Sequence, residues 1–321
     1  MYIVVTLNME YLAIVLGLIL LIKGGDWVLE GAVLFSLRLN IPKIIVGMTV
    51  VSFATSAPEL IVSINAALNG YPDLAVGNIV GSNIANLALV LGIVVFITPI
   101  KIEKVFYKYD WPAMILVTLL FYFSLKSDYS LSLFESVLFI IVLIAYLIFL
   151  IFYQKSRVND QEELNVDKSM KYLKILSLII FGGFFLWLGS EVLIKGSISL
   201  ATKLGISERI IGVTIVAFGT SIPELSTSIV AIINKEQNIS LGNLIGSNIF
   251  DMLGVIGITG ILSPIVISDI GLIDSDLIWM VSLAFLILPL VFFPNKMKFG
   301  RAEGVILLFC LLYTSPSPRD P

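Results

Sequence analysis

The chain of 321 residues contains no histidine and only one cysteine, Cys310. A single cysteine excludes an internal disulfide, and the absence of imidazole excludes the usual zinc sites and a histidine proton relay. Charged residues are also scarce, at 13% of the chain, whereas hydrophobic residues make up 58%. This balance excludes a soluble globular protein and predicts a chain that crosses a membrane many times.

The long apolar runs are continuous and lack the alternation of barrel strands, so they predict an all-α membrane protein. We expect ten transmembrane helices, of which the first and sixth are long enough to lie tilted. Their expected ranges are 10–38, 42–68, 72–98, 109–125, 131–154, 172–203, 207–233, 238–263, 273–293 and 302–314. The last apolar run ends at Tyr313 and is too short to cross a bilayer, so we expect a truncated helix and a foreign tail at 315–321.

Two stretches of sequence return 165 residues later. Ser52-Phe-Ala-Thr-Ser-Ala-Pro-Glu-Leu60 matches Ala217-Phe-Gly-Thr-Ser-Ile-Pro-Glu-Leu225, and Gly77-Asn-Ile-Val-Gly-Ser-Asn-Ile-Ala-Asn86 matches Gly242-Asn-Leu-Ile-Gly-Ser-Asn-Ile-Phe-Asp251. The hydrophilic segment 155–171 divides the chain into repeats at 1–154 and 172–314, each with five expected helices. Because five is odd, the second repeat enters the membrane upside down, which predicts an inverted repeat with a site at the midplane, as in secondary transporters.

Basic residues indicate the orientation of this arrangement. With the N-terminus outside, the loops on the inner side carry fourteen Lys or Arg residues, and the outer segments carry only Lys126, Lys203, Arg209 and Arg319. This asymmetry fits the positive-inside rule. We therefore expect a multi-pass protein of the cell membrane with its N-terminus outside and the 155–171 linker in the cytoplasm.

Prolines inside the repeated motifs predict discontinuous helices. Pro58 and Pro223 lack an N–H, so they free carbonyl groups about one turn earlier, at Ser52 to Ala54 and at Ala217 to Gly219. The three- and four-residue spacings place hydroxyl and carboxylate groups on one helical face. The groups brought together in this way are Thr55, Ser56 and Glu59 in the first repeat and Thr220, Ser221 and Glu224 in the second.

The second pair of motifs adds hydroxyl, amide and carboxylate groups, namely those of Ser82, Asn83, Asn86, Ser247, Asn248 and Asp251. Burying Glu59, Glu224 and Asp251 costs several kcal/mol each unless the acids are protonated, paired or bound to metal, and no Lys or Arg lies near them in sequence. We predict that these three carboxylates bind a cation. Ligands that are all oxygen favour Ca²⁺ and Na⁺ over zinc, copper or iron, and competition for them would produce obligatory exchange.

Two further membrane acids are explained by local pairing. Lys23 and Lys195 lie three and four residues from Asp26 and Glu191, respectively. We expect these residues to form pairs within their helices or to lie at interfaces between helices, with a role in sliding or gating as the alternative.

At the paired motifs the chain resembles the sodium/calcium exchanger family of the cation/calcium antiporter superfamily, most closely its short archaeal and bacterial members. The resemblance covers nearly the whole chain, up to Tyr313. It implies a Ca²⁺ site of Thr55, Glu59, Thr220 and Glu224, with Asn86 and Asp251 at the centre. It implies Na⁺ sites at Ser52, Ser56, Glu59, Ser82, Ala217, Thr220, Ser221, Glu224 and Ser247.

The resemblance also implies electrogenic exchange of more than two Na⁺ for each Ca²⁺, with sliding of the tilted first and sixth helices. Ser52 and Ala54 depart from the alanine and glycine of the family pattern. We expect no cofactor besides the transported ions, no nucleic-acid partner and a monomer in the lipid bilayer.

Several alternatives remain at this point. A proton-coupled or K⁺-dependent cation exchanger is the nearest, although proton exchangers of the superfamily carry an acid where this chain has Ser82 and Ser247. A channel would need no counter-ion, but an obvious pore loop is missing from the sequence. An intramembrane aspartyl protease would also use paired acids, but the neighbouring hydroxyls are typical of ion ligands and favour a transporter over an enzyme.

Overall fold

The structure is a computed structural model that describes residues 2–39, 41–154, 172–203, 219–294 and 296–314. The predicted linker at 155–171, the tail at 315–321 and Ala217 lie outside the described residues. The first repeat contains α1 Tyr2–Leu39, α2 Lys43–Val46, η1 Gly47–Val51, α3 Ser52–Thr55, α4 Ala57–Leu68, α5 Pro72–Ile84, η2 Ala85–Val90, α6 Leu91–Ile97, β1 Ile100–Lys101, η3 Phe106–Asp110, α7 Trp111–Asp128, β2 Ser130–Leu131, α8 Leu133–Phe149 and η4 Leu150–Gln154, the η segments being π-helical.

The second repeat shows a matching order of elements. It contains α9 Tyr172–Lys203, α12 Ile222–Ile233, α13 Gln237–Phe250, η7 Asp251–Val255, α14 Ile256–Leu262, β3 Ile265–Val266, η8 Leu272–Leu277, α15 Ile278–Phe292, β4 Lys298–Phe299 and α16 Arg301–Thr314. The helices are shorter than the predicted ranges where π-helical turns, strands and breaks interrupt them.

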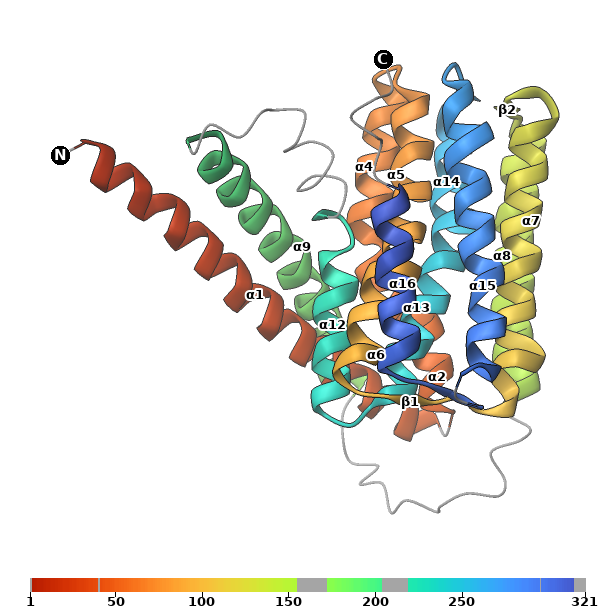
Figure 1. Cartoon of the computed structure of the whole chain (residues 1–321), viewed down its shortest axis with the longest axis horizontal. Coiled ribbons are helices and arrows are strands. Elements are labelled where there is room, and N and C mark those ends of the chain that lie inside the picture. Colours follow the sequence, from red (N-terminus) through yellow and green to blue (C-terminus); the bar gives the residue numbers. More distant parts are fainter. Residues whose placement is uncertain (1, 40, 155–171, 204–218, 295, 315–321) are drawn as a thin grey trace.

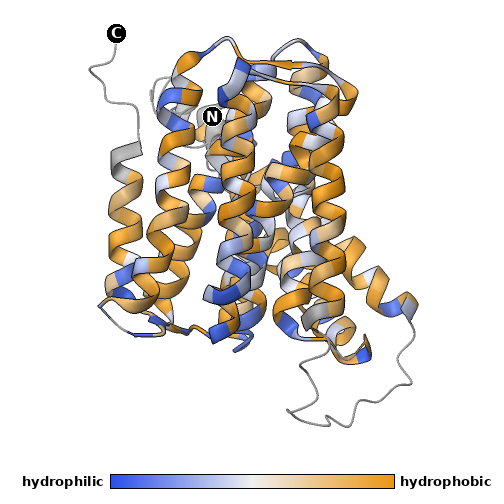
Figure 2. Cartoon of the chain, turned by 90° about the vertical axis from the view of Figure 1, so that its right-hand side faces the viewer, coloured by the Kyte–Doolittle hydropathy of each residue, from blue (hydrophilic) through white to orange (hydrophobic). Residues whose placement is uncertain are grey.

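Within the described ranges, six helices are long and apolar enough to cross a membrane, and a bent pair at residues 43–68 raises the number to seven. Hydrophobic residues cover most of the length of the helices, and hydrophilic residues gather near their ends and along part of the interior (Figure 2). The protein is therefore a helical multi-pass membrane protein.

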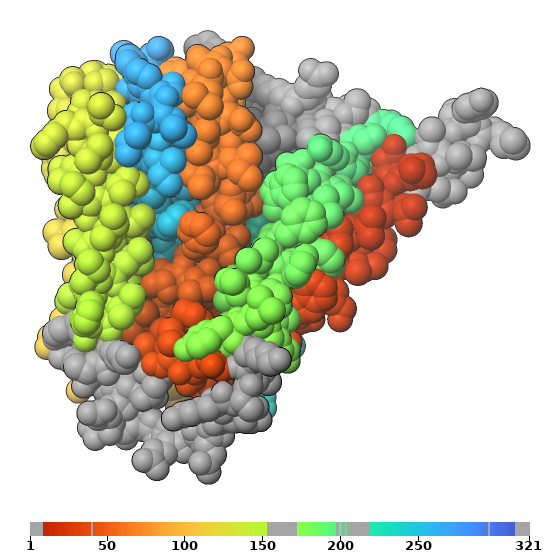
Figure 3. Space-filling model, turned by 180° about the vertical axis from the view of Figure 1, so that it is seen from behind, coloured from red at the N-terminus to blue at the C-terminus, as the bar shows by residue number. Residues whose placement is uncertain are grey.

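Helices α1 and α9 form a tilted antiparallel pair that projects from the upright bundle (Figure 1), and Figure 3 shows α9 lying across α1. Their backbones touch at glycines, because a Cβ built on Gly24 would lie 2.8 Å from the carbonyl oxygen of Gly182. An ion pair between Lys203 and Glu10, 2.7 Å long, joins the two helices as well. The predicted tilt of these two long helices is seen here as a tilt relative to the bundle.

The centre of the bundle is formed by the two helical segments that carry the second motif pair. Residues 72–97 and 237–262 have 78% and 83% of their most apolar window buried inside the protein, against 22–39% for the other long helices. Polar groups on these two segments are therefore shielded from lipid as well as from water.

Two short strand pairs connect the repeats. Strand β1 pairs with β4 through Ile100 and Phe299, and β2 pairs with β3 through Leu131 and Ile265. Strands β1 and β3 are counterparts at the 165-residue offset, yet β1 lies at the bottom of the bundle in Figure 1, whereas β2, the partner of β3, lies at the top. Equivalent strands thus occupy opposite ends of the molecule.

Candidate functional site

The helix that carries the first motif breaks at Ser56. Helix α3 ends at Thr55 and α4 begins at Ala57, and the two segments meet at an angle of 46°. Ser56 has φ −81° and ψ 5°, and Ser221 before α12 has nearly the same φ −84° and ψ 5°. Ser56 and Ser221 each lie two residues before a proline in the first turn of the following helix, where the missing N–H costs nothing. The first helical turn therefore carries Glu59 in α4 and Glu224 in α12.

The backbone carbonyls before the two prolines have different hydrogen-bond partners. The Ser52 carbonyl is engaged, because it accepts the Ser56 N–H at 2.9 Å and the Thr55 hydroxyl at 3.3 Å. Pro58 has no N–H to donate to Ala54, four residues earlier, so the carbonyl that loses its helical donor is that of Ala54. In the second repeat, the Gly219 carbonyl accepts the hydroxyl of Ser190 at 3.0 Å.

Three carboxylates are buried without compensation in the middle of the bundle. Glu59 is 1% exposed, and Glu224 and Asp251 are 0% exposed. Both carboxylate oxygens of each glutamate and Oδ1 of Asp251 form no hydrogen bond. None of the ion pairs between described residues includes any of the three. Burial on this scale is costly unless a cation or a proton is bound.

The three acids are close enough to interact electrostatically, because the charges of Glu224 and Asp251 both act on Glu59. The hydroxyls of Thr55 and Ser247 approach the Glu224 carboxylate. Across the described ranges, however, no group of three acidic side chains converges on one metal position. A cation here would therefore have a mixed shell of carboxylate, hydroxyl and amide oxygens.

Hydroxyl groups meet in two pairs that join the repeats. Thr55 Oγ1 lies 3.3 Å from Ser247 Oγ, and Thr220 Oγ1 lies 3.2 Å from Ser82 Oγ. At the 165-residue offset, Thr55 corresponds to Thr220 and Ser82 to Ser247. Thr55 and Thr220 thus face the central helix of the other repeat in the same manner.

The amide groups follow the same symmetry. Asn83 Nδ2 lies 3.4 Å from Asp251 Oδ2, and Asn86 Nδ2 donates to Asn248 Oδ1 at 3.2 Å. Asn83 corresponds to Asn248, and Asn86 to Asp251. Hydroxyl, amide and carboxylate groups of both repeats therefore meet in these contacts, whereas Ser221 Oγ is buried and forms no hydrogen bond.

Sequence reasoning omitted two asparagines and one serine. Asn243 accepts a hydrogen bond from the Thr55 hydroxyl at 3.2 Å, and its counterpart Asn78 lies beside Glu59. Both asparagines belong to the repeated Gly-Asn pair that opens the second motif, and this repetition could have identified them as site residues. Ser190, which caps the Gly219 carbonyl, lies in no repeated motif.

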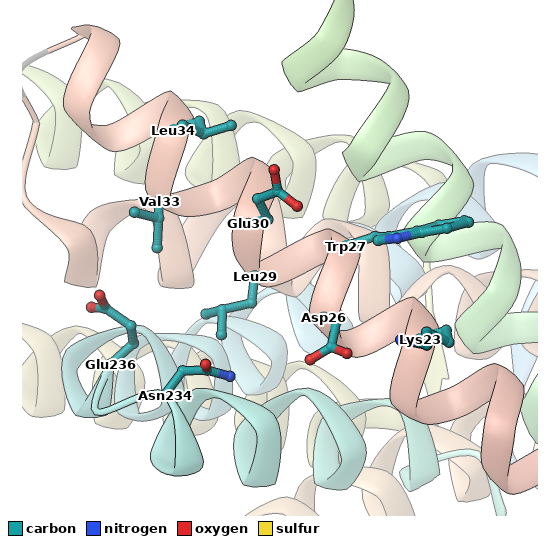
Figure 4. A pocket seen from close by; sticks show the side chains of 9 residues that line it. All are labelled: Lys23, Asp26, Trp27, Leu29, Glu30, Val33, Leu34, Asn234 and Glu236. Carbon is teal, nitrogen blue, oxygen red and sulfur yellow. The ribbon is translucent and has the colours of Figure 1, made fainter. Parts of the chain in front are cut away.

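The two membrane acids outside the site, Glu191 and Asp26, differ in their partners. Glu191 and Lys195 form the predicted pair within α9, at 2.8 Å, which confirms that prediction. Asp26 and Lys23 are not among the ion pairs of the described residues; they line a pocket of about 550 Å³ between α1 and the end of α12 (Figure 4). The predicted pair is therefore not formed at this position, whereas the predicted alternative, a place at an interface between helices, agrees with the pocket lining.

Comparisons with known proteins agree with this arrangement. The family described as sodium/calcium exchanger protein matches residues 9–152 and 174–314. CaxA of Alkalimonas amylolytica is 34% identical over 304 residues, covering 93% of this chain and 95% of CaxA. Sodium/calcium exchanger MaX1 of Methanosarcina acetivorans is 29% identical over 344 residues, covering 94% of this chain and 96% of MaX1.

A solved structure of the sodium-calcium exchanger NCX_Mj, soaked with 10 mM Na⁺ and no Ca²⁺, superposes with a TM-score of 0.81 at 30% identity. The match covers 98% of this chain and 100% of that structure. The chain therefore belongs to the sodium/calcium exchanger protein family.

Proposed function

We propose that the protein is a secondary antiporter that exchanges Na⁺ for Ca²⁺ across the cell membrane. The observation that carries the proposal is the group of three buried carboxylates, Glu59, Glu224 and Asp251, which have no basic partner among the described residues. An empty site with several negative charges is costly in the membrane interior. The protein would therefore switch the site from one side of the membrane to the other only when a cation is bound. Loading by either Ca²⁺ or Na⁺, but not both, yields exchange by alternating access.

The proposed ligands follow the two repeats. Ca²⁺ would be held by Thr55, Glu59, Thr220 and Glu224. Na⁺ would be held by oxygens of Ser52, Ser56, Glu59, Ser82, Ala217, Thr220, Ser221, Glu224 and Ser247, with Asn86 and Asp251 in the middle. The mirrored hydroxyl and amide contacts support this assignment, because they join side-chain oxygens of the two repeats. Exchange of more than two Na⁺ per Ca²⁺ would make transport electrogenic.

The proposed architecture has ten transmembrane segments in two inverted repeats, at 1–154 and 172–314, joined by a cytoplasmic linker at 155–171. The matching backbone angles of Ser56 and Ser221 support the repeat, and the placement of equivalent strands at opposite ends of the bundle supports its inversion. The distribution of Lys and Arg supports an N-terminus on the outer side. We propose that one chain is the functional unit.

The test is ⁴⁵Ca²⁺ uptake into proteoliposomes at clamped voltage. Vesicles that are loaded with Na⁺ and diluted into Na⁺-free medium are expected to take up Ca²⁺. Vesicles loaded with K⁺ or with acid are not expected to do so. Equal uptake driven by a proton gradient would contradict Na⁺ coupling and favour a proton-coupled exchanger. An absolute need for K⁺ would favour a K⁺-dependent one.

A first variant tests how the acids divide their roles. Asp251→Asn is expected to keep Ca²⁺ transport within roughly tenfold of wild type, because the counterpart position is already an asparagine, Asn86, whose amide oxygen can also bind a cation. Initial rates of ⁴⁵Ca²⁺ uptake measure the effect. Complete loss of Ca²⁺ binding in this variant would show that Asp251 belongs to the Ca²⁺ site itself.

A further inference from the structure

Asn243 and Asn78 occupy equivalent positions in the two repeats but have different partners. Asn243 is fully buried, and its side-chain oxygen accepts from the Thr55 hydroxyl of the other repeat at 3.2 Å. Asn78 instead turns its amide nitrogen to its own repeat, where it donates to Ser63 Oγ at 3.1 Å. The mirror contact between Asn78 and Thr220 is not formed, although both residues are described. This is a departure from the symmetry of the hydroxyl and amide pairs described above.

The neighbours of Thr55 show where its single hydroxyl hydrogen goes. The oxygens of Asn243, Ser52 and Ser247 lie 3.2, 3.3 and 3.3 Å from Thr55 Oγ1. The Ser52 carbonyl already accepts a shorter bond of 2.9 Å from the Ser56 N–H. Ser247 has a hydrogen of its own and can donate to Thr55. Of these three oxygens, Asn243 Oδ1 is the nearest, and it can only accept.

The direction of this hydrogen matters to a cation. A hydroxyl binds a cation through its oxygen lone pairs, with its hydrogen pointing away. Thr55 also lies beside the Glu224 carboxylate, which would compete for the same hydrogen. A hydrogen given to Glu224 would occupy the space and the carboxylate lone pair that a cation needs. A hydrogen given to Asn243 leaves both oxygens available.

We propose that Asn243 is a positioning residue for Ca²⁺: it accepts the hydrogen of Thr55 and so turns the lone pairs of Thr55 toward the ion beside Glu224. The inference rests on the proposed function, in which Thr55 and Glu224 are Ca²⁺ ligands. Asn78 does not serve Thr220 in this way. In the mirror pair of hydroxyls, Ser82 donates its hydrogen to the backbone carbonyl of Asn78 at 2.8 Å, so Thr220 is the donor to Ser82.

The arrangement of Asn243 is maintained at a cost. Its amide nitrogen is buried and has no hydrogen-bond partner, and the same is true of Ser228 Oγ, the counterpart of Ser63. Asn78 and Ser63 satisfy each other in the first repeat at 3.1 Å. A buried donor without a partner destabilises a protein. Asn243 therefore lacks the bond to Ser228 that would correspond to the bond between Asn78 and Ser63, and it contacts Thr55 instead. This is expected of a residue whose role is to position an ion ligand.

The first test is Asn243→Leu, which keeps the approximate shape of the side chain and removes its acceptor. We expect the apparent KM for Ca²⁺ to rise about tenfold, as for loss of one hydrogen bond in a buried site, while the maximal rate stays within about twofold. The assay is Na⁺-driven ⁴⁵Ca²⁺ uptake. If the variant gives no monodisperse protein in detergent, Asn243→Ser replaces it, because serine is polar but too short to reach Thr55.

A double-mutant cycle separates positioning from a general packing role. In a Thr55→Val background the hydroxyl is absent, so the substitution at Asn243 should have almost no further effect on Ca²⁺ affinity. In a Thr55→Ser background the full tenfold effect should return. Asn78→Leu is the matched control, and its effect should be additive with Thr55→Val. Additive effects of Thr55→Val and Asn243→Leu would overturn the proposal.

The cycle is also measured by equilibrium binding of ⁴⁵Ca²⁺ to purified protein, without a Na⁺ gradient. Wild-type protein that binds Ca²⁺ but shows no Na⁺-driven uptake would refute the proposed function, and the binding cycle would still decide the role of Asn243. Normal exchange by the wild type with no coupling between Asn243 and Thr55 would refute only the positioning role.

Discussion

Replacing Glu224 by glutamine is expected to abolish Na⁺-driven Ca²⁺ uptake, lowering the initial rate by at least about 100-fold. Glu224 is fully buried in the first turn of α12, and neither carboxylate oxygen has a hydrogen-bond partner. Its charge would balance that of the bound ion, and leaving one member of a buried charge pair uncompensated costs roughly 3–5 kcal/mol. Since 1.4 kcal/mol is a factor of ten, the expected loss exceeds 100-fold.

The counterpart Glu59→Gln should show a loss of the same size, because Glu59 is equally buried at the equivalent helix start. Glu103→Gln is the matched control: Glu103 is exposed, and its contact with the Asn238 amide at 3.2 Å needs only an oxygen acceptor, which glutamine keeps. All three variants are compared by ⁴⁵Ca²⁺ uptake and by elution from a sizing column. Retained wild-type uptake in a folded Glu59 or Glu224 variant would refute a shared site.

Much of this site could be predicted from the sequence because the motifs occur twice. The constant offset of 165 residues pairs Thr55 with Thr220 and Glu59 with Glu224. Burial follows from the apolar context, and the helix break follows from the missing N–H of Pro58. These conclusions depend only on local chemistry and on the existence of a repeat.

The remaining features depend on packing between the repeats, which no local pattern specifies. Asn78 and Asn243 stand in matching Gly-Asn pairs, yet only Asn243 contacts a threonine of the other repeat. Two nearly symmetric halves can differ in such contacts at a small cost in free energy. The sequence of one half does not indicate which contacts that half forms. Lys23 and Asp26 illustrate the same point, because a favourable spacing within one helix did not produce a pair.

The contacts of the Ser52 hydroxyl also depend on packing between segments. The family pattern has alanine at this position, and the sequence predicts only that the carbonyls of Ser52 to Ala54 are available as ion ligands. The structure shows its hydroxyl donating to the Gly47 carbonyl at 2.8 Å and lying 3.0 Å from that of Asn243. Ser52 thus joins η1 to α13. Its polar groups are satisfied by neighbouring backbone, which could be seen only once the two segments were placed together.

The contact between these two segments leads to the second large effect, which is expected for Gly246→Ala. A Cβ on Gly246 would lie 2.4 Å from Ser52 Oγ, 2.5 Å from the Met48 Cα and 2.6 Å from the Met48 carbonyl oxygen. Two of these atoms belong to backbone, which cannot turn away. Overpacking of this kind typically costs 1–3 kcal/mol and can cost more, so we expect a marked fall in thermal stability and in the yield of monodisperse protein.

Gly183→Ala is the control for Gly246→Ala. The atom nearest to a Cβ on Gly183 is the Cβ of Ala54, at 3.6 Å, which is an ordinary contact distance. That variant should melt within about 2 °C of wild type, since exposed or loosely packed substitutions change stability little. Combining Gly246→Ala with Ser52→Ala removes the contact to Ser52 Oγ but leaves both contacts to Met48. We therefore expect only partial rescue of the melting temperature. Full rescue would place the strain on the Ser52 hydroxyl, and wild-type stability of Gly246→Ala alone would show that α13 and η1 are farther apart than the structure places them.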